Sequence, residues 1–202
     1  MQPYINMDSS RIIEFVKCRT EFYKNIFNKK LMMNLNDSNI LDIGCGTGIV
    51  SFSFSPLVKS VMGIDPSQAM IDVANRSKTL YKSTNVTFIK GIFSDLCSDV
   101  NFNVIIMSNL LHIVNNFNYI MEKALSLLKQ NGILYIKHPT EKSIFGSTDL
   151  KPNHEEFNKI KYDKWILNIK KTKRRIYKYI KSNNLLLVYK YTDNNLHLFI
   201  SK

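Results

Sequence analysis

The sequence predicts an α/β fold of three layers, a sandwich in which helices cover both faces of a mostly parallel β-sheet. Short apolar runs alternate with segments of helical periodicity through the first two thirds of the chain, which is typical of successive βαβ units. In the last third, β-rich runs are separated by turn-forming residues, which favours an antiparallel hairpin at the edge of the sheet. The 202 residues, of which 45% are hydrophobic, suffice for the core of one domain.

The first half of the chain divides at polar, glycine and proline residues into alternating helices and strands. Helical spacing of apolar residues marks the helices, and short apolar runs mark the strands. In order, the predicted elements are a helix from Ser9 or Ser10 that ends before Asn34–Asn39, a strand at Ile40–Ile43, a helix over residues 47–57, a strand at Lys59–Ile64, a helix over Pro66–Leu80 opened by Ser67, and strands at Val86–Ile89 and Val104–Met107.

The second half begins with a helix whose apolar side chains share one face, and it ends in a β-rich region. Asn131-Gly132 is expected to terminate that helix as a left-handed C-cap. The predicted elements are a helix at Asn118–Lys129, a strand at Ile133–Lys137, a helix around Glu155–Ile160, and β-rich runs at Ile176–Ile180, Leu185–Tyr191 and Leu196–Ile200. The chain has no internal repeat and no linker, so we expect a single domain over residues 1–202.

Positive charge is concentrated in the last third of the chain. The whole sequence carries a net charge of +12, and residues 141–202 hold fourteen Lys and Arg against six Asp and Glu. Such an asymmetry is typical of proteins with an anionic partner. A second interpretation is open, because most of the basic residues are Lys in a chain also rich in Asn and Ile, which A/T-rich codons favour.

Several classes of protein are excluded by composition. No apolar run approaches the roughly 18–20 residues of a membrane span, and the first ten residues lack the pattern of a secretory signal. The three cysteines have irregular spacing that predicts neither a disulfide framework nor a metal site. We therefore expect a cytoplasmic protein with no membrane partner and no metal.

A glycine-rich loop follows the first predicted strand, in the segment Ile40-Leu41-Asp42-Ile43-Gly44-Cys45-Gly46-Thr47-Gly48. Loops of this kind between a strand and a helix bind nucleotides. The sixth position is Ile49 where dinucleotide-binding loops have glycine, and no Lys follows as in phosphate-binding loops. Asp42 would repel a pyrophosphate, but it suits a cationic ligand that carries an ammonium and a sulfonium group.

A second acidic residue, Asp65, follows the next predicted strand and lies 21 residues after Gly44. At about this spacing an acidic side chain accepts hydrogen bonds from the ribose hydroxyls of a bound nucleotide. Asp65 is also well placed to cap the helix over Pro66–Leu80, and the two roles are compatible.

From Ile40 to His138 the sequence resembles the class I, Rossmann-like, S-adenosylmethionine-dependent methyltransferases, particularly their small-molecule branch. Five segments carry the resemblance in the correct order, and they are Leu41–Gly48, Gly63–Ser67 with Met70, Val86–Gly91, Phe102–Ile105 with Leu111-His112, and Asn131–Ile136. The resemblance implies a seven-stranded sheet with its last strand antiparallel. It also implies an N-terminal helical lid (residues 1–35), a cofactor-binding half (36–138) and an acceptor-side part (139–202).

The resemblance implies S-adenosyl-L-methionine as cofactor and assigns its contacts. Asp42 and the glycine loop would hold the methionine end of the cofactor, and the backbone near Ser108 would meet the amino group. Asp65 would bind the ribose, and Pro66 and Ile92-Phe93 would flank the adenine. The implied cofactor-binding residues are Asp42, Gly44, Cys45, Gly46, Gly48, Asp65, Pro66, Met70, Ile92, Phe93 and Ser108. The family often has an acid where this chain has Ile92, so Ser94, Asp95 or backbone groups would have to bind the adenine amino group.

The acceptor contacts are predicted from residue chemistry near the ends of strands. His138 directly follows the fifth predicted strand and His112 lies four residues after Ser108, so either is a candidate general base, although His112 also suits simple packing. Arg19 and Tyr23 in the first helix are candidate contacts for an anionic acceptor. Tyr4 and Lys142 are further candidates for such a contact, and the loop Pro139–Pro152 and the first helix are expected to cover the acceptor pocket.

The predicted function is methyl transfer from S-adenosylmethionine to a small, anionic acceptor, most simply at oxygen. The first alternative is a tRNA or rRNA methyltransferase that uses the basic run Lys170–Arg175 to contact phosphates. The second is a protein that binds the cofactor without catalysis, which the missing acid at Ile92 favours. The sequence predicts no oligomeric state.

Overall fold

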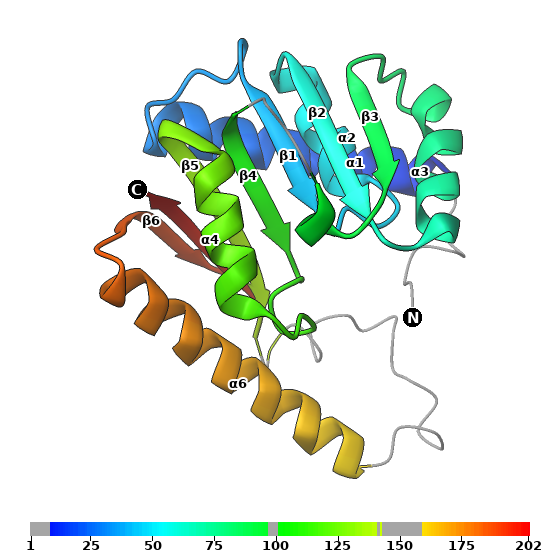
Figure 1. Cartoon of the computed structure of the whole chain (residues 1–202). Helices are drawn as coiled ribbons and strands as arrows, with labels where there is room; N and C mark the ends of the chain where they lie inside the picture. The colour runs from blue at the N-terminus through cyan, green and yellow to red at the C-terminus, as the bar shows by residue number, and fades with distance from the viewer. Residues whose placement is uncertain (1–8, 97–100, 141, 143–158) are drawn as a thin grey trace.

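A seven-stranded β-sheet lies at the centre of the protein, whose computed structural model describes residues 9–96, 101–140, 142 and 159–202 (Figure 1). Across the sheet the strands follow the order β3-β2-β1-β4-β5-β7-β6. Their bounds are β1 Asn39–Ile43, β2 Ser60–Asp65, β3 Val86–Lys90, β4 Phe102–Ser108, β5 Leu128–Pro139, β6 Leu186–Thr192 and β7 Asn195–Ser201.

One strand, β7, runs against its neighbours. β1 pairs in parallel with β2 and β4, β2 with β3, and β4 with β5. β7 pairs antiparallel with both β5 and β6. The order of strands reverses between β1 and β4, and at such a point the carboxyl ends of parallel strands leave a crevice that binds ligands in α/β proteins. The predicted fold class, with its antiparallel last strand, is confirmed.

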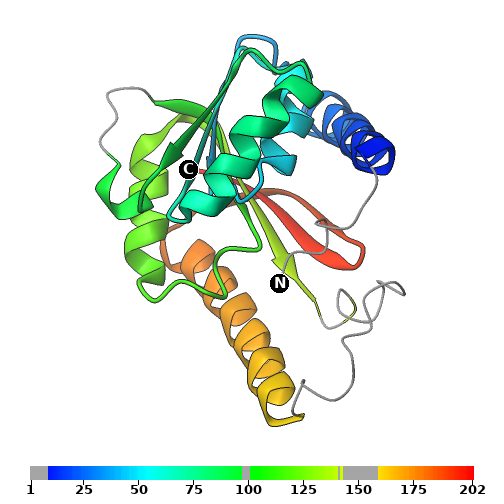
Figure 2. The same cartoon turned by 90° about the vertical axis from the view of Figure 1, so that its right-hand side faces the viewer.

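Helices cover both faces of this sheet (Figures 1 and 2). The first face carries α1 Ser9–Asn25, which continues as the π-helical turn η1 Ile26–Lys30, together with α2 Ile49–Phe54 and α3 Gln68–Leu80. The second face carries α4 Phe117–Leu127 and α6 Lys159–Ser182. Two short 3-10 turns, η2 Ser55–Leu57 and η3 Phe93–Asp95, complete the described elements.

Each face of the sheet has its own apolar core, because successive strand residues point to opposite sides. On the side of α1 and α2, the buried rings include Tyr23, Phe27, Phe54, Tyr135 and Phe199. On the side of α4 and α6, the buried side chains include Leu41, Ile105, Met121, Ile176 and Leu198. This alternation decides which residues of a strand reach the site described below.

The predicted strand at Ile176–Ile180 is wrong, because these residues form part of α6. Ile169, Ile176 and Ile180 are buried and recur at helical spacing, while the residues between them are largely exposed. Over five residues, the β-branched and aromatic side chains imitate a strand. The helical period becomes visible only over the full length of the amphipathic segment.

The predicted C-cap at Asn131-Gly132 is also wrong, since α4 ends at Leu127 and β5 begins directly at Leu128. Asn131 has the positive φ of 61° expected of a cap, but it lies within β5, where the pairing with β4 shifts register between Phe102 and Val104. A Cβ at Gly132 would come within 2.9 Å of the Lys129 carbonyl oxygen. The two residues therefore serve a bulge in the strand.

The other helices and strands agree with the prediction in type and order, with ends that differ by a few residues. Most of the expected helix around Glu155–Ile160 and of the expected covering loop Pro139–Pro152, as well as Tyr4, lies outside the described residues, while Lys142 is exposed. Within the described ranges, no helix has both the length and the apolar character needed to cross a membrane.

Candidate cofactor and acceptor site

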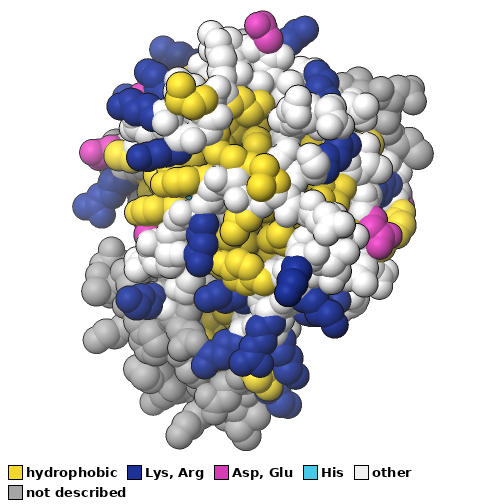
Figure 3. All heavy atoms as spheres, turned by 90° about the vertical axis from the view of Figure 1, so that its left-hand side faces the viewer, with side chains coloured by type: hydrophobic (Ala, Val, Ile, Leu, Met, Phe, Trp, Pro, Cys, Tyr) yellow, Lys and Arg dark blue, Asp and Glu magenta, His cyan; other side chains and the backbone are white. Residues whose placement is uncertain are grey.

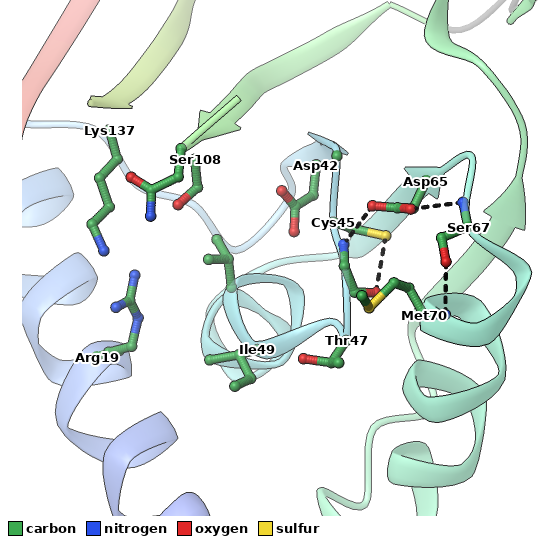
Figure 4. Close-up of a pocket in the computed structure, with 14 residues that line it drawn as sticks. Arg19, Asp42, Cys45, Thr47, Ile49, Asp65, Ser67, Met70, Ser108 and Lys137 are labelled. Atoms are coloured by element: carbon green, nitrogen blue, oxygen red, sulfur yellow. Dashed lines mark hydrogen bonds between the residues drawn. The ribbon is translucent and has the colours of Figure 1, made fainter. Parts of the chain in front are cut away.

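A pocket of about 410 Å³ opens at the carboxyl ends of β1, β2, β4 and β5 (Figure 4). Its walls come from α1, the glycine loop, the start of α3 and the strand ends. The lining residues are Arg19, Asp42, Gly44, Cys45, Gly46, Thr47, Ile49, Val50, Asp65, Ser67, Met70, Ser108, Asn109 and Lys137. The structure thus brings eight of the predicted site residues together, namely Arg19, Asp42, Gly44, Cys45, Gly46, Asp65, Met70 and Ser108.

The glycine loop turns sharply between β1 and α2. Gly44, Gly46 and Gly48 all have positive φ, which side chains other than glycine rarely adopt. A Cβ at Gly46 would meet no atom within 4 Å, so the backbone here faces open space in the pocket. A ligand can therefore approach the peptide groups of this loop closely.

Asp65 connects the end of β2 to the glycine loop. One carboxylate oxygen accepts a hydrogen bond from the Gly46 N–H at 3.0 Å, and the other accepts one from the Ser67 N–H at 2.9 Å (Figure 4). Ser67 is the N-cap of α3, and its hydroxyl accepts a hydrogen bond from the Met70 N–H. The helix is therefore capped by Ser67 and not by Asp65. Each carboxylate oxygen can accept a second hydrogen bond from a ligand hydroxyl.

Asp42 lies at the bottom of the pocket with 1% of its surface exposed. The Ser51 hydroxyl of α2 donates a hydrogen bond of 2.7 Å to its carboxylate. Burial raises the pKa of Asp42 to about 6, against the smaller lowering effects of Ser51 and Arg19. A cationic ligand beside this carboxylate would favour its charged form.

A basic pair lies across the pocket from Asp65. Figure 4 shows Arg19 and Lys137 at one end, Asp65 and Met70 at the other, and Asp42 between them. Burial and the Arg19 guanidinium lower the pKa of Lys137 to about 8, and Asp193 raises it by a smaller effect. Sequence reasoning missed Lys137; the signal for it was its position next to His138 on the same strand.

Four predicted cofactor contacts, Gly48, Pro66, Ile92 and Phe93, lie outside the pocket lining. Pro66 is exposed in the turn between β2 and α3, and Ile92 is 57% exposed after β3. Phe93 is buried against α4, where the Lys123 ammonium lies 5.6 Å from its ring centroid. Gly48 is the N-cap of α2, where an added Cβ would come within 2.5 Å of the Phe88 ring. The adenine contacts assigned to Pro66, Ile92 and Phe93 stay predictions.

Tyr23 is fully buried behind Arg19 and supports it. Its hydroxyl accepts a hydrogen bond of 2.7 Å from the guanidinium, and its ring stacks on Phe54 at a centroid distance of 4.2 Å. Tyr23 therefore orients Arg19 toward the pocket.

The two candidate bases, His112 and His138, lie together on the other side of the sheet, beneath α6. Their ring centroids are 5.8 Å apart, and the His138 Nε2 lies 3.1 Å from the Ile169 carbonyl oxygen. His138 is 1% exposed, and neither ring lines the pocket. Burial lowers the pKa of both, that of His112 to about 4. The catalytic role assigned to them stays a prediction.

The residues of the pocket fit S-adenosylmethionine. Asp42 offers a buried carboxylate for a cationic group, Asp65 offers acceptors for ribose hydroxyls, and the open backbone at Gly46 admits a ligand closely. These are the residues that would hold the cofactor.

The fold agrees with solved methyltransferases. The plantazolicin methyltransferase BpumL in complex with SAH superposes with a TM-score of 0.70 at 18% identity, over 96% of this chain and 85% of that one. An S-adenosylmethionine-dependent methyltransferase from Aquifex aeolicus gives a TM-score of 0.66 at 16% identity, over 96% and 98%. At such identities the likeness establishes the fold.

Curated relatives match about half of the chain or less. A ubiquinone biosynthesis O-methyltransferase of Pelagibacter ubique is 33% identical over 108 residues, which are 50% of this chain and 42% of that protein. A release factor glutamine methyltransferase of Fusobacterium nucleatum is 38% identical over 80 residues, which are 38% of this chain and 23% of that protein. The chain thus spans less than half the length of these relatives.

A family model described as a methyltransferase domain matches residues 34–184, which include the glycine loop, both acids and most of the sheet. With the strand order and the pocket found here, the match confirms the resemblance noted in the sequence. The chain belongs to the methyltransferase domain family and has the fold of the class I S-adenosylmethionine-dependent methyltransferases.

Proposed function

We propose that this protein transfers a methyl group from S-adenosylmethionine to an oxygen atom of a small, anionic acceptor. The observation that carries the proposal is the division of charge within one pocket. Asp42 and Asp65 supply negative charge and hydrogen-bond acceptors, and Arg19 and Lys137 supply positive charge. The first pair suits the ammonium, sulfonium and ribose groups of the cofactor, and the second suits an acceptor anion.

The work of the chain in this reaction is binding, orientation and exclusion of water. When bound, the cofactor supplies a methyl group on a sulfonium, whose carbon–sulfur bond breaks as the new carbon–oxygen bond forms and whose bonding electrons stay on sulfur. The glycine loop, Asp42 and Asp65 would fix the donor, while Arg19 and Lys137 would hold the acceptor in line with it.

One of the relatives supports an oxygen acceptor without identifying the molecule. The ubiquinone biosynthesis enzyme of Pelagibacter ubique is named for O-methylation. The release factor enzyme of Fusobacterium nucleatum is named for methylation of a glutamine, so related chains serve different acceptors. The positive charge of Arg19 and Lys137 in the pocket is therefore stronger support for the proposal than the names of the relatives.

Calorimetric binding of S-adenosylhomocysteine tests the cofactor site. We expect Asp65→Ala to weaken binding by about tenfold or more, because a ligand hydroxyl loses a charged acceptor. Asp72→Ala is the matched control, since Asp72 is an exposed acid of α3 outside the pocket. Failure of the wild-type protein to bind S-adenosylmethionine or S-adenosylhomocysteine would contradict the proposed function, and binding without methyl transfer to any acceptor would favour a cofactor-binding protein.

The outer face of α6 favours a second candidate, methylation of RNA. Exposed basic residues occur along this helix from Lys164 to Lys181, and they are Lys164, Lys170, Lys171, Lys173, Arg174, Arg175, Lys178 and Lys181. Figure 3 shows Lys and Arg side chains gathered on the lower part of this side of the molecule. A groove lined by Lys170, Lys173, Arg174 and Tyr177 lies among them.

The salt dependence of RNA binding separates the two candidates. Phosphate contacts release counterions, so the affinity of a true RNA-binding surface falls steeply and linearly on logarithmic axes as salt rises. Replacing Lys170, Lys173 and Arg174 by Gln would flatten that slope. RNA affinity that is weak at low salt and unchanged by the three substitutions would leave the small-molecule proposal as the sole candidate.

A further inference from the structure

Three neighbouring strands place chemically active side chains on one face at the site. Asp42 on β1, Ser108 on β4 and Lys137 on β5 all line the pocket, and Ser108 and Lys137 are direct partners across the β4–β5 pairing. The side chains that flank them on the same face belong to the core beneath α1 and α2, such as Ile106 and Tyr135. Lys137 therefore projects toward α1, whereas His138, one residue later, projects toward α6.

Arg19 meets Lys137 from the opposite wall. Figure 4 shows the guanidinium of Arg19 and the ammonium of Lys137 pointing toward each other across the end of the pocket. The Tyr23 hydroxyl accepts a hydrogen bond from Arg19, and the Tyr23 ring packs against the buried rings of Phe54 and Tyr135. Tyr23 therefore fixes the position of the Arg19 guanidinium. Two cationic groups from separate elements thus meet at one end of the pocket, where they can attract an anionic group of a ligand.

The groups around Lys137 make it a proton acceptor near neutral pH. Burial is the main cause that lowers its pKa to about 8, Arg19 adds to the effect, and Asp193 in the turn between β6 and β7 opposes it. His197 on β7 pairs with Lys137 across the sheet, and burial lowers the pKa of His197 to about 4, so it is neutral beside the lysine. A fraction of Lys137 is thus uncharged at the pH where exposed lysines are fully protonated.

We propose that Lys137 is the general base for the acceptor and that Arg19 binds the oxyanion it creates, so that the acceptor is an acidic hydroxyl of the phenol or enol type. The O–H bond of the acceptor breaks, its proton forms an N–H bond on the Lys137 amine, and the electron pair stays on oxygen for attack on the methyl carbon. The ammonium then returns the proton to solvent. This inference rests on the proposed methyl transfer and names the acceptor class and the base.

A coloured phenol tests the anion site without turnover. 4-Nitrophenol is yellow as the phenolate, so its ionisation can be followed by absorbance in the presence of protein saturated with S-adenosylhomocysteine. We expect the apparent pKa of the bound phenol to fall by about one pH unit or more, since two cations stabilise its anion. Lys137→Met and Arg19→Met should each reduce the shift, and Lys59→Met, which removes an exposed lysine outside the pocket, should leave it unchanged.

Titration of Lys137 itself tests the base. Reductive methylation with ¹³C-formaldehyde labels every lysine for NMR, and the resonance lost in Lys137→Met identifies this residue. We expect its pKa to lie near 8, well below the ordinary value of 10.5, and Arg19→Met to raise it by removing a neighbouring cation. A Lys137 that titrates with the exposed lysines would overturn the assignment as base.

The binding of S-adenosylhomocysteine and the shift of 4-nitrophenol distinguish failure of the proposed base from failure of the proposed methyltransferase function. If S-adenosylhomocysteine does not bind the wild-type protein, the methyltransferase proposal itself fails. If it binds but 4-nitrophenol shows no shift, the anion site is wrong while the cofactor site stands. If Lys137→Met weakens S-adenosylhomocysteine and leaves the phenol shift intact, the basic pair serves the cofactor carboxylate and the inference is overturned.

Discussion

At the scale of single residues, the charge of Asp42 depends on its surroundings. It is buried at the end of β1, hydrogen-bonded to Ser51, and its pKa is raised to about 6 mainly by burial. A buried carboxylate without a cation is costly, so the pocket gains when a positively charged ligand arrives. The same coupling makes ligand affinity depend on pH.

We predict that the affinity for S-adenosylhomocysteine falls as the pH drops through about 6. Below this pH, Asp42 is protonated and no longer attracts the ligand ammonium. Calorimetric titrations between about pH 5 and pH 8 would measure the change. Asp42→Asn should bind weakly at every pH and lose this dependence; a variant that keeps the same pH profile would show that another group titrates.

His138 illustrates how one residue's neighbours decide between two roles. Its ring is buried, and its Nε2 contacts the Ile169 carbonyl of α6. We expect His138→Ala to reduce the free energy of unfolding by about 2–3 kcal/mol, because a buried polar contact and a packed ring are lost. Urea denaturation would measure this, and unchanged S-adenosylhomocysteine affinity would be the control. Loss of turnover with unchanged stability would instead support the catalytic role.

At the scale of elements, α6 is the part that the sequence pattern misrepresents. Ile176 is fully buried against the sheet, while Lys178 two residues later is exposed. A strand would place residues 176 and 178 on the same face, whereas a helix places them on different faces. The burial of one and exposure of the other follow from the helix.

Substitutions at these two positions test the helix. We predict that Ile176→Ala lowers the free energy of unfolding by about 2–5 kcal/mol, since it leaves a cavity in the core beneath α6. Lys178→Ala should change it little, because that side chain lies in solvent. Equal effects at both positions in chemical denaturation would contradict the amphipathic helix.

Most elements could be predicted because their signals are local. Ile40–Ile43 is a buried strand between polar and glycine residues, and Ser67 caps a helix three residues before Met70. Asn131 failed as a cap because its left-handed backbone serves a strand bulge, which depends on the register of β4 against β5. Register is a property of two strands, so the sequence near Asn131 does not contain it.

At the scale of the whole molecule, buried titratable groups have opposite effects on how the stability of the fold changes with pH. Burial lowers the pKa values of His112, His138 and His197, so the unfolded chain binds more protons than the folded one as the pH falls below 6.5. Asp42 has the opposite effect. Because its pKa is raised in the folded state, the folded chain binds more protons at this group between pH 3.8 and about pH 6, and the folded state becomes more stable as the pH falls through this range. Of these four groups, the three histidines destabilise the folded state in acid and Asp42 stabilises it.

We therefore predict that the melting temperature falls when the pH is lowered from about 7.5 to about 5. The double variant His112→Asn with His138→Asn should be less stable at neutral pH but lose part of this dependence, because two of the titrating groups are gone. Calorimetry at several pH values would measure both. A melting temperature that rises toward pH 5 would show that Asp42 outweighs the histidines.

The sequence alone determined the fold class and the family, and it predicted the glycine loop and the two acids that line the pocket. The glycine loop and Asp42 are contiguous, and Asp65 follows the next strand, so short-range pattern and spacing suffice to place them. Only the tertiary structure decided which residues form the basic end of the pocket. It places Lys137 rather than His138 in the pocket, because neighbouring strand residues point to opposite faces and α1 brings Arg19 over one of them.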